Sequence, residues 1–418
     1  MHLATNRFQA DKPFPGRPGN FPAPEFSGSF AMLLPQLQRA LAEAGYKVPT
    51  PIQEKAIPPL LAGRDLFGCA QTGTGKTAAF TLPILQILQQ KKRPSFSTEP
   101  RVLILAPTRE LAAQIGASIS TYGRHLPLRR TVIFGGVGQS GQVAALKRGI
   151  DLLVATPGRL LDLMQQGFVS LRGIEIFVLD EADRMLDMGF LPDIRRIISK
   201  LPGSRQSLFF SATLEEPVLE LARTLVRDAV SVKIAPQSPV LERIGQKVLF
   251  VDKNNKDALL SNILSREETS NRILVFTQMK HMANRVVNKL AAAGIEAVAI
   301  HGNKSQNART EALADFKSGR VKIMVATDIA ARGIDVEGIS QVINFDMPIE
   351  AETYVHRIGR TARAGADGDA VSFCSAEDRF YLRRIERFIR KPLAVDYAHP
   401  FHSSMAAGTK NDKSQKNR

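Results

Sequence analysis

The sequence has no tryptophan, only two cysteines and no apolar run long enough to span a bilayer. Cys69 and Cys374 both lie in apolar stretches, which favours buried, reduced thiols over a disulfide. No Cys/His cluster has metal-site spacing, and the N-terminus carries Pro and Gly where a secretory signal would need an apolar core. We therefore expect a cytoplasmic protein with no membrane partner and no disulfide partner.

Acidic residues are also in short supply. Forty Asp and Glu stand against 56 Lys and Arg, so the formal net charge is +16. Such a surplus usually indicates a polyanionic partner, with nucleic acid ahead of a membrane surface, although a merely soluble basic surface is the alternative. At 418 residues the chain is too long for one typical core, which predicts two domains.

The most informative stretch is the octapeptide at 70–77, between an apolar run at 65–69 and a helix-like segment at 78–90. This context is typical of a phosphate-binding P-loop, because the glycines and the helix N-terminus direct backbone N–H groups at an anion. Lys76 would reach the β- and γ-phosphates, and the Thr77 hydroxyl would ligate magnesium (Mg²⁺). An ordinary glycine-rich turn is the alternative. The expected nucleotide-binding residues here are Ala70, Gln71, Thr72, Gly73, Thr74, Gly75, Lys76 and Thr77.

Short apolar runs alternate with amphipathic segments along most of the chain. They are typical of parallel strands covered on both faces by helices, which predicts an α/β fold. The expected strands are 102–105, 152–154, 176–179, 208–210, 273–276, 297–300, 323–325, 342–345 and 370–373.

The second half of the chain echoes the first. A short segment that begins at Arg101 resembles one that begins at Arg272, and 272 − 101 = 171. A separate segment, 153–156, resembles 324–327, and 327 − 156 is also 171. Chance similarity between apolar strands is the alternative, but two echoes at one offset favour two domains of the same fold.

Composition divides the chain further. We expect a disordered arm at 1–25, a first domain at 26–232, a linker at 233–247, a second domain at 248–393 and a disordered basic tail at 394–418. A basic amphipathic helix at 380–391 is expected to close the second domain, with an RNA-facing role as the alternative.

An acidic cluster follows the run at 176–179. Asp180 would hold Mg²⁺, mostly through water, and Glu181 would orient and deprotonate the lytic water. Alone, the cluster would be better explained as an acidic helix N-terminus, but a P-loop in the same chain favours the catalytic interpretation.

The same tetrapeptide, Asp-Glu-Ala-Asp at 180–183, is a family signature, and the chain resembles the DEAD-box ATP-dependent RNA helicases over residues 26–392. Ala70 is the usual residue of that family's P-loop. The supporting motifs, in the family's order, are Pro-Thr-Arg-Glu-Leu at 107–111, Gly-Gly at 135–136, Thr-Pro-Gly-Arg at 156–159, Ser-Ala-Thr at 211–213, Ala-Thr-Asp-Ile-Ala-Ala-Arg-Gly-Ile-Asp at 326–335 and Tyr-Val-His-Arg-Ile-Gly-Arg-Thr-Ala-Arg at 354–363. The sequence at 301–306 is most similar to that of the bacterial RhlE-type subgroup.

The resemblance implies two tandem RecA-like domains, each a mainly parallel sheet flanked by helices, with ATP in the cleft between them. Gln53 would pair with the adenine edge and Tyr46 would stack on it, whereas Phe26 and Phe30 both lie off the family's spacing for a further aromatic residue. The remaining implied ATP-site residues are the ribose contact Asp335, its neighbour Gly333, and the arginine fingers Arg360 and Arg363.

The resemblance also implies a linkage between the ATP cleft and an RNA track. The linking residues would be Asp183, Ser211, Thr213 and His356. The RNA contacts would be Pro107, Thr108, Arg109, Gly136, Thr156, Arg159, Arg309 and Thr327. Hydroxyls, N–H groups and arginines of this kind grip phosphates and sugars without reading bases.

These patterns predict an ATP-dependent RNA helicase with RNA-stimulated ATP hydrolysis and low sequence specificity, with ribosome-assembly or RNA-decay proteins as candidate partners. Three alternatives stay open: an ATP-gated RNA clamp, a DNA helicase or translocase, and a plain NTP hydrolase. The last leaves the charge of +16 unexplained.

Overall fold

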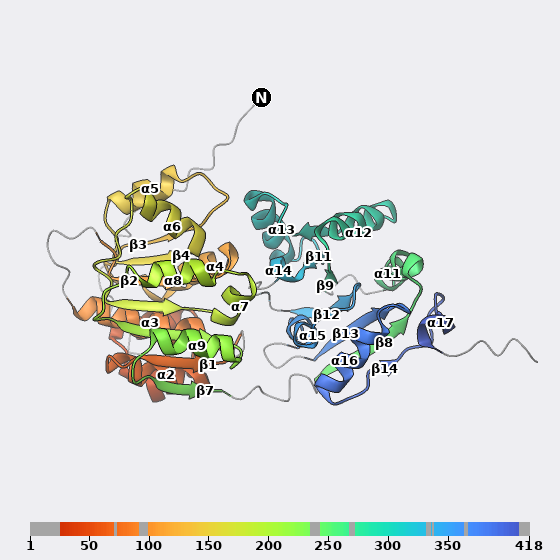
Figure 1. Ribbon diagram of the computed structural model, residues 1–418, viewed down its shortest axis with the longest axis horizontal. Helices are drawn as coiled ribbons and strands as arrows, with labels where there is room; N and C mark the ends of the chain where they lie inside the picture. Colours follow the sequence, from red (N-terminus) through yellow and green to blue (C-terminus); the bar gives the residue numbers. More distant parts are fainter. Residues whose placement is uncertain are drawn as a thin grey trace, which may run out of the picture.

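The computed structural model describes residues 26–70, 73–91, 99–234, 243–266, 272–331, 336, 338–362 and 367–408. Figure 1 shows two β-sheets, each flanked by helices, lying side by side along the long axis of the molecule. None of the described helices is both long and apolar enough to cross a lipid bilayer.

The first sheet is seven-stranded and parallel throughout, in the order β3-β4-β2-β5-β6-β1-β7. Its strands are β1 (Leu66–Cys69), β2 (Val102–Leu105), β3 (Arg130–Ile133), β4 (Leu152–Ala155), β5 (Ile176–Leu179), β6 (Gln206–Ser211) and β7 (Val230–Lys233). The helices between them are η1 (Gly28–Met32), α1 (Pro35–Glu43), α2 (Pro51–Leu61), α3 (Lys76–Gln90), α4 (Arg109–Tyr122), α5 (Ser140–Lys147), α6 (Pro157–Gln165), α7 (Ala182–Asp187), α8 (Leu191–Ile198) and α9 (Glu216–Leu225).

Each face of this sheet has its own core. Val102 and Ile104 of β2 pack with η1 and α1 to α4, whereas Leu103 and Leu105 pack with α5 to α9 on the other face. Burial on both faces is why the central strands appear in the sequence as unbroken apolar runs.

The second sheet is also seven-stranded and parallel, in the order β10-β11-β9-β12-β13-β8-β14. Its strands are β8 (Ile244–Phe250), β9 (Arg272–Thr277), β10 (Val298–Ile300), β11 (Ile323–Thr327), β12 (Ile339–Asn344), β13 (Gly368–Cys374) and β14 (Ala394–Val395). The helices are η2 (Lys253–Asn255), α11 (Lys256–Leu264), α12 (Lys280–Ala292), α13 (Gln306–Ser318), α14 (Asp328–Ala331), α15 (Ala351–Ile358), α16 (Arg379–Ile389) and α17 (Ser404–Ala407). Helices α11 and α12 cover one face and α13 to α17 the other.

The two sheets have the same topology, which confirms the prediction of two domains with one fold. Position by position, β3 corresponds to β10, β4 to β11 and β2 to β9. Val102 pairs with Leu152 in the first sheet and Ile273 with Ile323 in the second, so both partners shift by the same 171 (273 − 102 and 323 − 152). The sequence echo therefore reflects one pair of neighbouring strands kept in one register.

Two predicted boundaries are wrong. β8 begins at Ile244, inside the expected linker, and residues 394–408 are folded, because β14 pairs with β8 and Ala406 of α17 is buried in the core under α16. The Ser403 hydroxyl also donates a hydrogen bond to Asp252. The parts of these predictions at 1–25, 235–242 and 409–418 lie outside the described residues, and the other boundaries stay predictions.

This correction predicts different effects for two truncations. Ending the chain after residue 408 should leave the thermal midpoint of the second domain unchanged. Ending it after residue 393 removes β14 and α17 and should cost about 2 kcal/mol, or ~4–8 °C in the midpoint. Differential scanning calorimetry of both chains checks this, and equal midpoints would contradict the packing described for 394–408.

Candidate functional site

Three predicted motifs follow adjacent strands of the first sheet. The P-loop follows β1, the acidic cluster follows β5 and Ser-Ala-Thr closes β6, and these strands are neighbours in the order β5-β6-β1. Because all strands are parallel, their carboxyl ends lie at one edge of the sheet, where ligands bind in open α/β folds. The topology thus brings the three motifs together.

The P-loop curves around its own lysine. Gly73 and Gly75 have φ angles of 86° and 95°, in the left-handed region that favours glycine. Lys76 begins α3, and its buried Nζ donates a 2.8 Å hydrogen bond to the Ala70 carbonyl. Two residues of the predicted loop, Gln71 and Thr72, lie outside the described residues. A phosphate at this helix N-terminus would offer Lys76 a charged acceptor in place of the carbonyl.

Gln53 touches the P-loop directly. Its Oε1 accepts a hydrogen bond from the Thr50 N–H at 2.8 Å, and its Nε2 donates to the Gly75 carbonyl at 3.2 Å. A Cβ atom on Gly75 would overlap the Gln53 amide, so this position requires glycine. These two bonds use one N–H donor and one oxygen lone pair of the Gln53 amide. The second N–H and the second lone pair are left to bind an adenine edge.

The aromatic residues near Gln53 have separate surroundings. The Tyr46 hydroxyl lies 2.9 Å from that of Tyr122, their rings pack edge to face, and 37% of Tyr46 is exposed. Phe30 is buried in the core with Phe26 against its edge. Tyr46 therefore has surface to offer a base, whereas Phe30 serves packing.

Asp180 and Glu181 are both buried, and their pKa values move in opposite directions. Burial raises the pKa of Asp180 to about 7, against the opposing charge of Lys76. Burial would also raise the pKa of Glu181, but the cations Arg184, Lys76 and Arg360 lower it below its usual value. Arg184 lies 2.9 Å from Glu181, whose φ of 53° is in the left-handed region. Such strain in a non-glycine residue is typical of functional sites.

The chemistry of Asp180 fits Mg²⁺. Magnesium prefers hard oxygen ligands and keeps several waters, and a divalent cation would favour the ionised carboxylate that burial disfavours here. Thr77 supplies a hydroxyl in the first turn of α3. This helix follows β1, which is separated from β5 in the sheet by β6 alone.

Asp183 joins the acidic cluster to the Ser-Ala-Thr segment. Its Oδ2 accepts hydrogen bonds from the N–H groups of Ala212 and Thr213 at 2.9 and 3.1 Å. The Thr213 N–H also donates to the Ser211 hydroxyl at 3.2 Å. The Thr213 hydroxyl is buried without a partner in the described part of the chain, which leaves it available to a ligand.

A cavity of about 630 Å³ separates the two domains at this edge. Glu181, Asp183 and Thr213 line it from the first domain, and His356 and Arg360 line it from the second. The structure therefore brings these predicted catalytic and linking residues to one gap. The predicted Arg363, Gly333 and Asp335 lie outside the described residues.

Arg357, which the sequence did not single out, fixes α15, the helix that carries His356 and ends two residues before Arg360. It is buried, forms bonds of 2.6 and 2.8 Å with Asp328, and donates to Asn344 at 3.1 Å. Farther along, Ala362 has a φ of 54°, in the left-handed region that favours glycine. The cost of alanine there is about 1 kcal/mol.

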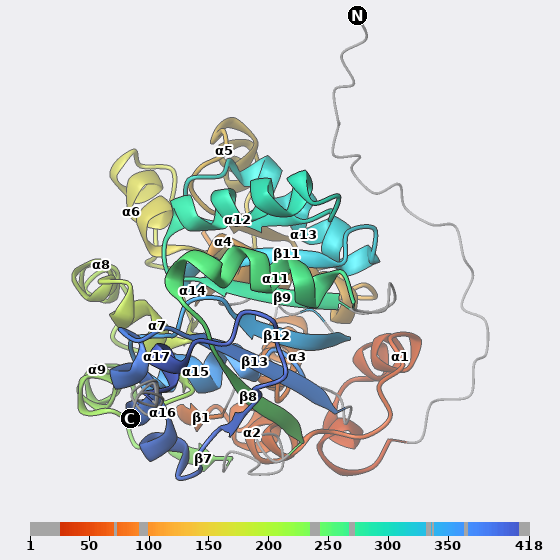
Figure 2. The ribbon, with the colours of Figure 1, turned by 90° about the vertical axis from the view of Figure 1, so that its right-hand side faces the viewer.

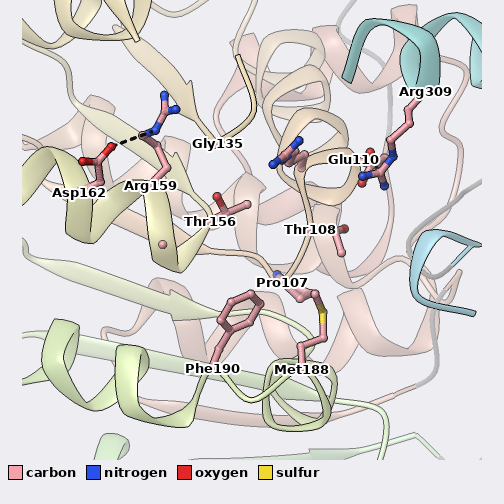
Figure 3. Close-up of a pocket in the computed structure, with 12 residues that line it drawn as sticks. Pro107, Thr108, Glu110, Gly135, Thr156, Arg159, Asp162, Met188, Phe190 and Arg309 are labelled. Carbon is pink, nitrogen blue, oxygen red and sulfur yellow. Dashed lines mark ion pairs between the residues drawn. The ribbon is translucent and has the colours of Figure 1, made fainter. Parts of the chain in front are cut away.

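A second cavity of about 480 Å³ lies over the carboxyl ends of β2 and β4 (Figure 3). The predicted RNA contacts that line it are Pro107, Thr108, Arg109, Thr156, Arg159 and Arg309. Thr327 is buried at the end of β11 and is not among the lining residues. The sequence did not predict the apolar wall made by Met188 and Phe190, which Figure 3 shows below Pro107 and Thr156.

Gly136 lies directly against the guanidinium of Arg109, one of the residues that line this cavity. Its φ is 76°, and a Cβ atom there would overlap the Arg109 guanidinium. The same guanidinium donates to Gln306 of the second domain at 3.2 Å. Gly136 thus keeps space for an arginine that spans the two domains.

Glu110 links the domains beside the same cavity. Its carboxylate lies 2.8 Å from Arg309, and both side chains are nearly buried. Gln306 donates to Glu110 at 3.3 Å. Arg309, predicted as an RNA contact, therefore also holds the two domains together, and Glu110 and Gln306 are functional candidates that the sequence did not reveal.

Comparisons with known proteins agree with this geometry. The DEAD/DEAH box helicase model matches residues 50–221, and the helicase conserved C-terminal domain model matches residues 255–365. The RhlB ATP-dependent RNA helicase of Pseudomonas syringae is 41% identical over 369 residues, which cover 87% of this chain and 93% of that protein. The chain belongs to the DEAD-box family of ATP-dependent RNA helicases.

Other DEAD-box relatives are longer. The DBP2 helicase of Candida albicans is 44% identical over 334 residues, which cover 79% of this chain but only 59% of that protein. Among solved structures, S. cerevisiae Dbp5 bound to RNA and ADP BeF3 has a TM-score of 0.77 at 31% identity, covering 88% of this chain and 96% of that one. Mss116p bound to ssRNA and AMP-PNP has a TM-score of 0.78 at 27% identity, covering 92% and 81%. The RhlE-type subgroup stays a prediction.

The Gly136 contact predicts a loss of RNA affinity. In Gly136→Ala the new methyl group displaces the Arg109 guanidinium, so we expect roughly ten-fold weaker binding of single-stranded RNA, or about 1.4 kcal/mol. Gly138→Ala is the matched control, because nothing lies within 4 Å of a Cβ atom there. Fluorescence anisotropy with a labelled RNA measures both, and equal affinities of the two variants would contradict this role.

Proposed function

We propose that this chain is an ATP-dependent RNA helicase that locally unwinds short RNA duplexes or remodels RNA–protein complexes. RNA would stimulate its hydrolysis of ATP to ADP and phosphate. The observation that carries the proposal is the inter-domain cavity in which Glu181 of one domain faces Arg360 of the other. A site divided in this way is complete only while the domains are close together.

In this proposal Glu181 positions the attacking water and accepts its proton, while Lys76 and Arg360, with Arg363, stabilise charge on the transferred phosphoryl group. The lowered pKa of Glu181 supports its role as a base, since it keeps the carboxylate ionised. Mg²⁺, held by Thr77, Asp180 and water, would neutralise charge on the phosphates. Gln53 and Tyr46 would bind adenine, and Asp335 the ribose.

RNA is proposed to lie in the second cavity, against Thr108, Arg109, Thr156 and Arg159, with Thr327 farther along the second domain. Two arginines and two hydroxyls suit phosphates and sugars, so recognition would follow the backbone with low sequence specificity. The RNA in the solved Dbp5 and Mss116p structures supports this substrate class.

Closure would couple the two sites. ATP and RNA each gain contacts from both domains when the cleft closes, and hydrolysis with product release would reopen it. An ATP-gated RNA clamp would use the same contacts. Strand displacement with ATP, set against long-lived RNA retention in a non-hydrolysable analogue, separates the two activities. A DNA helicase would instead show equal stimulation by DNA, and a plain NTP hydrolase would need no RNA.

We also propose a cytoplasmic location, with ribosome-assembly or RNA-decay proteins supplying the targeting that backbone recognition lacks. Cys69 and Cys374 are both free thiols, which supports a reducing compartment.

Substitutions in the cleft test the reaction. Lys76→Ala and Glu181→Gln should abolish RNA-stimulated ATP hydrolysis, and Arg360→Ala should slow it by ~10³-fold or more while nucleotide binding persists. A phosphate-release assay with and without single-stranded RNA measures the rates, and a fluorescent ATP analogue measures binding.

Arg223→Ala is the matched control for arginine loss, because this exposed side chain of α9 pairs with Glu216 at the surface. It should hydrolyse ATP at the wild-type rate. A wild-type rate that is the same with and without RNA would refute the coupling, and full activity in Arg360→Ala would refute the shared site.

A further inference from the structure

Helix α16 (Arg379–Ile389) presents an outer stripe that the proposed function does not use. Leu382 and Ile385 are buried, which confirms that the helix closes the second domain. The opposite side follows helical spacing and carries two phenylalanines and a series of cations. We name this surface the α16 stripe; it comprises Phe380, Arg383, Arg384, Arg387, Phe388, Arg390 and Lys391.

The aromatic side chains of the stripe lie outside the core. Phe380 is 65% exposed and Phe388 is 49% exposed, although both could have packed inward on a helix that buries leucine and isoleucine. Phe380 packs edge to face with Tyr381, with ring centroids 5.8 Å apart, and the Arg384 guanidinium also lies 5.8 Å from the Phe380 ring. The Phe380 ring is therefore held in place while much of its surface stays open.

The charge of the segment is strongly one-sided. Residues 379–391 contain six basic side chains and one acidic side chain, a balance of 6 − 1 = +5. The acidic residue, Glu386, faces the domain and accepts a hydrogen bond from the Leu393 N–H at 3.0 Å. Arg384 pairs with Glu350 at 3.0 Å, while Arg383, Arg387, Arg390 and Lys391 are exposed. A solvated helix face usually mixes both signs, and this one does not.

The end of the described chain lies beside the same helix. A Cβ atom on Gly408 would overlap the Arg379 guanidinium, so the chain passes the first residue of α16 before residue 409. The sequence that follows, 409–418, carries four basic residues, Lys410, Lys413, Lys416 and Arg418, against Asp412. The described chain therefore ends next to the first residue of α16.

We propose that the α16 stripe is a second RNA-binding surface, which takes single-stranded RNA separately from the cavity at Arg109. Phe380 and Phe388 would stack on bases, and the exposed cations would bind the phosphates between them. Aromatic rings interspersed with arginines are the general means of binding single strands without sequence preference. Charge complementarity favours RNA over a protein, because a stripe of one sign on a protein with net charge +16 needs a polyanion.

Its position gives this surface a distinct role. Helix α16 packs against α15 of the second domain, whereas most residues of the RNA cavity belong to the first. RNA on the stripe would stay attached when the cleft opens after hydrolysis, so the enzyme would keep its substrate between cycles. The inference rests on RNA being the substrate, as proposed above.

Two double variants test the stripe in the full chain. Phe380→Ala with Phe388→Ala removes the stacking surfaces and should weaken binding of a labelled 20-nucleotide RNA, without nucleotide, by roughly five-fold or more. Arg383→Glu with Arg387→Glu should weaken it further and lower the slope of log affinity against log salt by at least ~1.4, for two lost phosphate contacts. All four side chains are exposed or half-exposed, so the thermal midpoint should not change.

Lys289→Glu with Lys317→Glu is the matched control, because it makes the same charge change on exposed last-turn residues of α12 and α13. It should bind RNA as the wild type does. Wild-type affinity in the phenylalanine variant, or an equal loss in the lysine control, would overturn the proposal. The assay contains no ATP, so its failure would be distinct from a failure of RNA-stimulated hydrolysis.

Discussion

Two carboxylates buried side by side, Asp180 and Glu181, impose the condition that the rest of the site satisfies. A buried charge is tolerated only when it is paired, and here the compensating cations come from three places: the P-loop, helix α7 and the other domain. Lys76 and Arg184 are local, but Arg360 arrives across the cavity. A triphosphate with its metal ion would enter this same balance. The electrostatics of one edge of one sheet thus depend on the position of the second domain.

In the second domain, a buried lysine at the corresponding sheet edge is paired with carboxylates of the protein itself. Lys256 opens α11 after β8, as Lys76 opens α3 after β1, and it is equally buried. Its Nζ lies 3.0 Å from Asp378 and 3.8 Å from Asp346, which follow β13 and β12, the counterparts of β6 and β5. The lysine is thus neutralised by the protein itself. The second sheet therefore has an edge at which the charges of these three side chains are already paired within the protein.

Burial explains which parts could be predicted from sequence. β2 and β5 were predicted to the residue, because central strands covered on both faces are unbroken apolar runs. The expected strands do not include β3, β7 and β8, which mix polar with apolar residues, or β14, which is only two residues long. Motif residues identified the cleft, but Glu110 with Arg309 and the anchoring of Arg357 depend on contacts between distant segments, which local patterns do not contain.

Both cavities are lined by residues of the two domains, so ATP at one and RNA at the other, as proposed above, could affect each other without touching. Glu110 and Arg309 hold the domains together beside the cavity at Arg109, and Glu181 and Arg360 line the other cavity from opposite domains. A ligand at either place that favours closure lowers the cost of closure for the other, by an equal free energy in each direction. If Arg309 contacts RNA as predicted, the RNA phosphates must compete for it with its carboxylate partner Glu110. Breaking that ion pair would then offset part of the RNA binding energy, which would favour release of RNA when the domains separate.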